Sequence, residues 1–343
     1  MRGSLILSAL ASQPWALDQN YLATMSGVLR RWSAGQPASP EVMAEVEAAQ
    51  AARGARAKAT ANVGGGIAVL SLYGVMSQRA SMVDDISGAG GTSTQAFTQS
   101  LRAALADDSI SGIIIDIDSP GGSVFGTAEL AAEIMSARGT KPIYGFVNSL
   151  CASAAYWTGS QCEQLFITPG GQAGSIGVYM QHVDESAALD AEGYKVNYIS
   201  AGKYKVEGNS LGPLDDEALS FLQSQVNSYY QSFTSAVAKG RGAPVASVRD
   251  GMGQGRCLLA ADALAAGMVD GICTMDDVIK KMQKAIKGTA GARADDVALP
   301  VAAEIQAPAA PVAADDPVAP SGAPAAHAAR AAARRRALEL AGL

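Results

Sequence analysis

Residues 113–122 read Ile-Ile-Ile-Asp-Ile-Asp-Ser-Pro-Gly-Gly, an apolar run that ends in turn-forming residues. A run bounded in this way is typical of a strand buried on both faces, as in a parallel sheet. A helix is predicted to begin near Thr127, and a second strand to cover residues 142–147. Strands that alternate with helices indicate crossover units, so the predicted fold class is α/β with a parallel sheet.

The flanking sequence continues this pattern. Residues 67–75 are predicted to form another strand. One helix face is expected further on, formed by Phe97, Leu101, Ala104 and Leu105. Residues 214–239 are predicted to form a long helix that Pro213 and Asp215 start, with its apolar face turned towards the core.

Composition divides the chain into three regions. Residues 1–60 are rich in alanine and predict a helical N-terminal arm, whereas residues 61–287 carry the alternating strands and helices. Residues 288–343 are dominated by Ala, Pro and Asp, which bury too little apolar surface to offset the entropy of ordering, so a disordered low-complexity tail is expected. The basic end of this tail has two open interpretations, a solvated segment or a scaffold or recruitment segment.

The bulk properties of the 343 residues exclude several classes of protein. A net charge of −6 gives no overall basic field, so no nucleic-acid partner is expected. The four cysteines have no zinc-site spacing and predict reduced, buried thiols, with no metal or other cofactor. No apolar run approaches the roughly 20 residues that span a bilayer, so we expect a cytoplasmic protein without a membrane anchor.

Hydrolysis would require a nucleophile and donors for an oxyanion, and two segments supply candidates. Ser153 lies among small residues that would let a substrate carbonyl reach its hydroxyl, although from the pattern alone a small-residue helix packed against the sheet is the better explanation. Gly121 and Gly122 would let backbone N–H groups approach a ligand, although most such turns have no catalytic role.

A serine nucleophile also requires a base. His182 is the histidine within the predicted globular region, and it lies in the strand-like residues 178–183, where a structural role is the ordinary explanation. Lysine is the remaining candidate type, because burial disfavours its charged form and can leave a neutral amine.

Several motifs together resemble the signal peptide peptidase A family, which includes the capsid-maturation (prohead) proteases of tailed bacteriophages. The resemblance covers about residues 65–285. The motifs occur in this order: Asp116 to Gly122, Ala152 to Trp157, Gly174 to Val178, Ala201 to Lys205, Gly255-Arg256, and Ala261 to Gly271. Each motif is loose, but the ordered set is specific.

The resemblance implies a Clp-protease/crotonase-like α/β fold and a serine endopeptidase with a Ser–Lys dyad. The family serine corresponds to Ser153, its lysine to Lys205, and the serine that hydrogen-bonds the lysine to Ser175. The oxyanion donors would be backbone N–H groups at Gly121, Gly122 and Ala154, whereas Lys203 is interpreted as a surface charge. The resemblance also implies a homo-oligomer, because the serine and lysine of relatives often meet across subunit boundaries.

Three functions remain open within this interpretation. The first is a phage capsid assembly protease that cleaves scaffold and also itself, with capsid scaffold and capsid proteins as partners, in the host cytoplasm or inside the prohead. The second is a soluble bacterial protease similar to signal-peptide peptidases, and the third is mainly a capsid scaffolding protein with self-processing activity. An acyl-CoA enzyme on a crotonase-like fold is disfavoured, because the acidic residues typical of that chemistry are missing.

Overall fold

The computed structural model describes residues 13–18, 66–79 and 91–296, together with the isolated positions 27, 31, 39, 44 and 48. These residues belong to one compact unit that spans residues 1–296. The disordered tail was predicted to begin at residue 288, but in the structure residues 288–296 belong to helix α12 (Met275–Asp296). The rest of that tail and most of the N-terminal arm lie outside the described residues, so these two predictions are not tested there.

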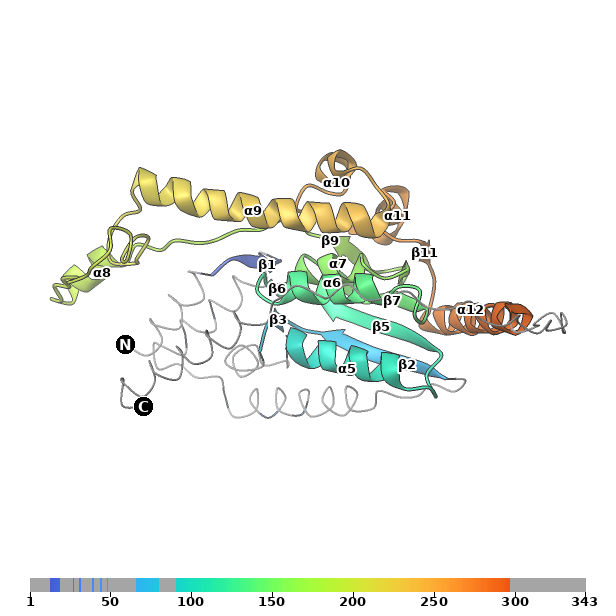
Figure 1. The fold of residues 1–343 in the computed structure, drawn as a ribbon. Helices are drawn as coiled ribbons and strands as arrows, with labels where there is room; N and C mark the ends of the chain where they lie inside the picture. Colours follow the sequence, from blue (N-terminus) through green and yellow to red (C-terminus); the bar gives the residue numbers. More distant parts are fainter. Residues whose placement is uncertain are drawn as a thin grey trace, which may run out of the picture. The chain divides into compact units, whose positions relative to one another are not determined.

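A mainly parallel sheet forms the centre of the described fold (Figure 1). Its strands are β2 (Ile67–Tyr73), β5 (Gly112–Ser119), β7 (Ile143–Ala152), β8 (Gln164–Ile167), β9 (Gln172–Gly174), β10 (Cys257–Leu259) and β11 (Gly271–Ile272). The neighbours β2, β5 and β7 run parallel, as the sequence predicted, and β10 pairs antiparallel with β9.

Strand β7 is longer than the sequence predicted. Residues 142–147 were expected to be the whole strand, because Asn148 and Ser149 interrupt the apolar run, yet β7 continues to Ala152. It does so by changing partners: its first half pairs with β8 and its last three residues pair with β9. The second partner satisfies the backbone groups that a polar stretch would otherwise leave to water.

Strand β5 is buried on both faces, which confirms the interpretation of its continuous apolar run. Ile113, Ile115 and Ile117 pack in the main hydrophobic core. Ile114 faces the opposite way and packs in a second cluster with Met282 of helix α12 (Met275–Asp296).

The main core lies between the sheet and a layer of helices. Those that contribute to it are α5 (Thr94–Ala106), α6 (Thr127–Ala137), α7 (Ala154–Gly159), α9 (Asp216–Arg241), α10 (Val245–Gly251) and α11 (Ala260–Ala265). The predicted face of α5 is confirmed, since Phe97, Leu101 and Ala104 are buried there. A further short helix, α8 (Ser186–Ala191), precedes α9 and has no buried residue.

Helix α9 begins and ends close to the predicted positions, but its apolar face is buried only in part. The Asp215 side chain caps its first turn by accepting the Ala218 N–H at 2.7 Å. Phe233 is fully buried and stacks on Trp157 at 4.6 Å, whereas Leu219 is 52% exposed. Periodicity identified an apolar face correctly, but it carried no information about which part of that face the sheet layer covers.

A second, smaller sheet lies beside the first. Its order is β1 (Trp15–Leu17), β6 (Gly121–Ser123), β3 (Met76–Ser77) and β4 (Thr92–Ser93). Strand β1 pairs antiparallel with β6 and was not predicted, because residues 1–60 were interpreted as helical. The structure therefore joins a segment near the chain's first residues to the glycines that follow β5.

Packing of α5 against the sheet generates a stability prediction. Leu101 is fully buried, so Leu101→Ala should lower the free energy of unfolding by about 2–5 kcal/mol. Leu264 on α11 is 40% exposed and supplies the matched control, with an expected loss below about 1 kcal/mol. Denaturant titration of the two variants measures both; equal losses would contradict the assigned core.

Candidate active site

Ser153 lies at the junction where β7 ends and α7 begins. Its side chain is only 1% exposed, and its backbone has a φ of 54°, a region that non-glycine residues rarely adopt. The Ser153 N–H donates to the Gly174 carbonyl at 2.7 Å, and the Trp157 N–H donates to the Ser153 carbonyl at 2.8 Å. A serine held in a strained strand-to-helix turn is a recurrent arrangement for a nucleophile.

The segment after β9 passes directly beside Ser153. Ala152 pairs with Gly174, so Ser175 follows immediately, and it too has a positive φ, of 53°. The Ser153 hydroxyl faces the Gly177 carbonyl at 3.5 Å. The structure thus brings the predicted Ser153 and Ser175 to one place through backbone pairing.

Two of the predicted oxyanion residues, Gly121 and Ala154, lie side by side at this junction. A Cβ built on Gly121 would lie 2.9 Å from the Ala154 nitrogen, so the two backbones touch. A Cβ on Gly122 would collide with the Met76 carbonyl oxygen. Ala154 occupies the first position of α7, where its N–H has no helical acceptor and is available to an oxyanion.

Side-chain hydrogen bonds that the sequence did not predict hold this glycine turn in place. The Ser119 hydroxyl donates to the Gly74 carbonyl at 2.6 Å and accepts the Gly121 N–H at 3.2 Å. The Ser149 hydroxyl donates to the Asp118 carboxylate at 2.7 Å. The Ser119–Gly74 and Ser149–Asp118 partners lie 45 and 31 positions apart in the sequence, so no local pattern could have indicated these two bonds.

Asp116, the first residue of the glycine motif, is buried in strand β5 ahead of the turn. It is 7% exposed and accepts a hydrogen bond from the Tyr73 hydroxyl, while its Oδ1 atom is buried without such a bond in the described part of the chain. Burial raises the pKa of Asp116, and its hydrogen bond to Tyr73 and the neighbouring Asn148 amide oppose that rise in part. Burial also raises the pKa of Tyr73, so its hydroxyl remains a donor.

Lys205 lies on an exposed turn that precedes α9, and no hydrogen bond among the described residues joins it to Ser153. Its neighbour Lys203 fixes this turn to the start of α9 through an ion pair with Glu217 at 2.8 Å. Ser153 instead lies near Phe233, in the second half of α9, because Trp157 in the turn after Ser153 stacks on the Phe233 ring. From Glu217 to Phe233 the helix rises about 24 Å, several times the reach of a lysine side chain. Within one chain, the structure does not bring Lys205 to Ser153.

His182 is not placed as a base for Ser153. Its Nε2 atom lies 2.9 Å from the Asn209 carbonyl, and no described contact links it to Ser153. The strand expected over residues 178–183 is reduced to one bridge, between Tyr179 and Trp15. These contacts therefore support a structural role for His182.

The described cysteines are unpaired thiols. Cys151 and Cys162 are buried, and Cys257 and Cys273 are half-buried. Burial raises the pKa of Cys162 to about 12 and that of Cys151 well above its ordinary value. Both remain protonated and unreactive at neutral pH, as expected for thiols with a packing role.

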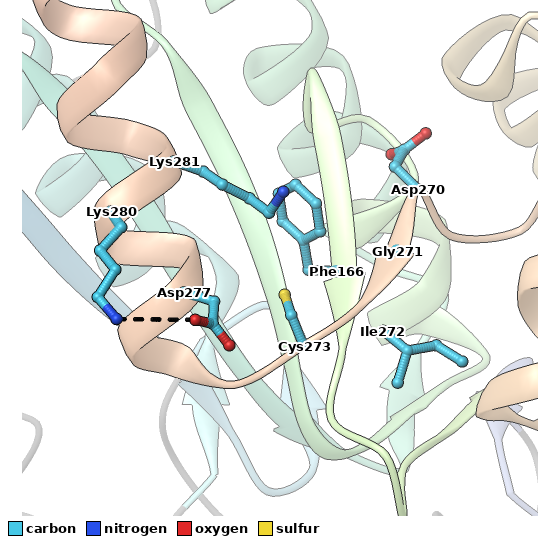
Figure 2. A pocket seen from close by; sticks show the side chains of 8 residues that line it. All are labelled: Phe166, Asp270, Gly271, Ile272, Cys273, Asp277, Lys280 and Lys281. Atoms are coloured by element: carbon cyan, nitrogen blue, oxygen red, sulfur yellow. Dashed lines mark ion pairs between the residues drawn. The ribbon is translucent and has the colours of Figure 1, made fainter.

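A hollow of about 450 Å³ lies between β11 and the first turns of α12 (Figure 2). Figure 2 shows Lys281 over the Phe166 ring, 5.4 Å from its centroid, and an ion pair between Lys280 and Asp277. None of the predicted catalytic residues is among the eight that line it. The candidate active site is therefore the junction at Ser153 and not this hollow.

The parallel sheet, its crossover helices and the serine at the end of β7 have the layout of a Clp-protease-like α/β fold. Residues 136–288 match the model of peptidase family S49. The matched range contains Ser153, Ser175 and Lys205, whereas Gly121 and Gly122 precede it.

Three relatives illustrate the range of similar proteins. Capsid assembly protease C of Escherichia phage lambda is 31% identical over 221 residues, which are 64% of this chain and 49% of that protein. Head-tail preconnector protein GP5 of Enterobacteria phage P21 is 28% identical over 293 residues, 82% of this chain and 58% of the relative. The chloroplastic serine protease SPPA of Arabidopsis thaliana is 26% identical over 175 residues, 51% and 26% of the two chains. This chain thus spans about half the length of the two phage relatives.

None of the helices in the described ranges combines the length and the apolar character required to cross a bilayer.

The buried Asp116 generates a pH-dependent prediction. Because its pKa is raised on folding, the folded chain keeps a proton that the unfolded chain releases, so stability falls as pH rises from the ordinary aspartate range through the raised value. Asp116→Asn keeps an acceptor for the Tyr73 hydroxyl but has no proton to release, so it removes this pH-dependent loss of stability. Its melting temperature should exceed that of wild type at neutral pH, and the difference should vanish near pH 3.

Melting curves of the two proteins from pH 3 to pH 8 measure this effect. Asp118→Asn, an exposed position on the same strand, controls for the loss of one negative charge at this sheet edge. A less stable Asp116→Asn variant at neutral pH would show that the ionised carboxylate is stabilised by its neighbours.

Proposed function

We propose that the chain is a serine endopeptidase with Ser153 as nucleophile and Lys205 as general base. The observation that carries this proposal is the junction at Ser153, where a strained serine, a glycine turn and the unpaired Ala154 N–H meet. Ser153 and Ala154 lie in the range that matches a peptidase family, and the sequence motifs around them have the order of the family that the sequence resembles.

In the proposed reaction, neutral Lys205 accepts the Ser153 proton as the serine oxygen attacks the peptide carbonyl. The N–H groups of Gly122 and Ala154 stabilise the oxyanion that forms, whereas the predicted Gly121 N–H is already bound by the Ser119 hydroxyl. The protonated lysine then donates to the leaving amine, and the acyl-enzyme forms. Lys205 next activates a water molecule that hydrolyses the ester, and Ser175 orients the lysine throughout.

The contacts of the two neighbouring lysines support Lys205 rather than Lys203 as the base. The Lys203 amine is bound by the Glu217 carboxylate and the Tyr204 hydroxyl. The hydrogen bond to Glu217 raises the pKa of Lys203, which keeps it charged. A charged, paired amine cannot accept the serine proton, whereas Lys205 has no such partner among the described residues.

The exposed surface around Lys205 supports assembly of several copies. Residues 191–205 are exposed without interruption and include large apolar side chains. Tyr194, Val196, Tyr198 and Tyr204 are each about half exposed, and Ile199 is fully exposed. Soluble chains rarely leave such a contiguous apolar surface uncovered. We infer that a second copy covers it and that Lys205 reaches the Ser153 of that copy, which gives a homo-oligomer.

The substrate that we propose is capsid scaffold together with capsid proteins, the chain itself included. The names of two relatives, a capsid assembly protease and a head-tail preconnector protein, support this role. Such a protease would act in the host cytoplasm or inside the prohead. The second candidate is a bacterial protease similar to signal-peptide peptidases, which the likeness to the chloroplastic serine protease SPPA favours.

Intact-mass analysis over time tests the dyad. Wild type should trim an unfolded test protein or itself, whereas Ser153→Ala and Lys205→Ala should each lose about 10³-fold or more of that activity. Lys203→Ala is the matched control and should retain it, since that amine is assigned to an ion pair. Cleavage by Ser153→Ala at the wild-type rate would refute the assignment of the nucleophile.

Mixing two inactive variants tests whether neighbours share a site. In a mixed oligomer of Ser153→Ala and Lys205→Ala, half of the serines and half of the lysines are intact. Activity should recover to about one quarter of the wild-type value if each site takes its lysine from another copy. A mixture that stays inactive, although the variants exchange subunits, would place both residues of the pair in one chain.

A further inference from the structure

Strand β1 is hydrogen-bonded along both of its edges. On one edge it pairs antiparallel with β6, where the Asp18 N–H donates to the Pro120 carbonyl at 2.9 Å. On the other edge, Trp15 and Tyr179 exchange two backbone hydrogen bonds of 2.9 and 3.0 Å. The strand therefore fills a slot whose walls are residues 121–123 and 177–179, which we call the strand channel.

The register with β6 directs this segment at the candidate nucleophile. Leu17 pairs with Gly121, the residue whose backbone touches the Ala154 nitrogen. On the other edge, the described pairing is the single bridge between Trp15 and Tyr179. Two residues before Tyr179, the Gly177 carbonyl faces the Ser153 hydroxyl at 3.5 Å. Leu17 is thus the residue of β1 that the pairing with β6 brings to the active site.

Strand β1 is buried so completely that it closes the site around Ser153. Trp15 and Ala16 are fully buried and Leu17 is 2% exposed, while Ser153 itself is 1% exposed. The Ala16 carbonyl lies so close to Gly121 that a Cβ there would collide with it. A nucleophile that acts on other chains requires access, so the occupant of the channel must leave before a substrate enters.

The backbone geometry of the channel suits an extended peptide of any origin. A strand added between two existing edges gains main-chain hydrogen bonds that do not depend on sequence, and alternate side chains supply selectivity. An occupant from the same chain competes with free peptides at an effective concentration that reaches the millimolar range. Peptides at micromolar concentration would then be excluded.

We propose that Trp15–Leu17 occupies the peptide-binding channel of this chain's own active site and blocks it until the segment is displaced. This inference rests on the proposed peptidase function, because it takes Ser153 as the reactive group. It assigns the channel to extended peptides that place an aliphatic side chain at the Leu17 position, beside Ser153, and an aromatic one at the Trp15 position.

The first test measures access to the site without requiring catalysis. In the full chain with Ser153→Cys, the thiol introduced at position 153 is alkylated with iodoacetamide, and peptide mapping follows its modification. Adding Trp15→Ala or Leu17→Asp should accelerate this alkylation at least about tenfold, since each change weakens the buried segment. Leu101→Ala, which destabilises the core through helix α5 and not through β1, is the control and should leave the rate unchanged.

Two internal readings separate opening of the channel from unfolding. Cys151 is fully buried, so its alkylation reports loss of the fold. If Leu17→Asp exposes Cys151, then Trp15→Ala, which introduces no charge, decides the result. Acetyl-Trp-Ala-Leu-amide added in excess should slow alkylation at position 153 in the opened variant. Equal alkylation rates with and without the β1 changes, or no protection by the peptide, would overturn the proposal.

The second test uses chains with the native Ser153 and a peptide substrate. Trp15→Ala should lower KM several-fold with little change in kcat, because only access to the channel improves. Faster alkylation at position 153 without any peptide cleavage would leave the self-blocking channel intact and refute the peptidase function. Alkylation at position 153 that the β1 changes leave unaltered, together with normal peptide cleavage, would support the peptidase function and refute the self-blocking channel.

Discussion

A serine with a φ of 54° stands where β7 ends and α7 begins, and a strained backbone of this kind costs on the order of 1–3 kcal/mol. The conformation persists only because its surroundings fix it. The Ser153 N–H is held by the Gly174 carbonyl, and every residue of α7 is buried. The Ser153 hydroxyl is therefore positioned by two features together: the last pairs between β7 and β9, and the packing of α7.

The Arg138 guanidinium helps to fix the far end of α7. Arg138, at the end of α6, donates to the carbonyls of Gln161 at 2.7 Å, Cys162 at 2.6 Å and Gly240 at 2.9 Å. This side chain ties the loop after α7 to the last turn of α9, while the Trp157–Phe233 stack joins the middle of the two helices. Rigid support from several elements is what a preorganised catalytic group requires.

Local pattern predicted the parts of the fold that local physics decides. The run 113–117 indicated a strand buried on both faces, and Gly121 and Gly122 indicated a turn with close backbone approach; the structure has both. The true end of β7 and strand β1 depend instead on partners far away in the chain, β9 and β6. For the site, the sequence supplied Ser153 and Ser175, but not Ser119, which positions the glycine turn through Gly74.

The two proposals describe a site that is incomplete in an isolated chain for two separate reasons. Its proposed base, Lys205, lies in the exposed segment 191–205, which the Lys203–Glu217 ion pair fixes to the start of α9. Its nucleophile lies beside the second half of that helix. Its peptide channel holds a segment of the same chain. A protease that shares a compartment with its own unassembled substrates benefits from both conditions, since contact between copies supplies the lysine and displacement of β1 admits the peptide. The bonds that hold β1 are backbone pairs that a substrate strand can replace one for one, so opening the channel requires no rearrangement of the strained serine.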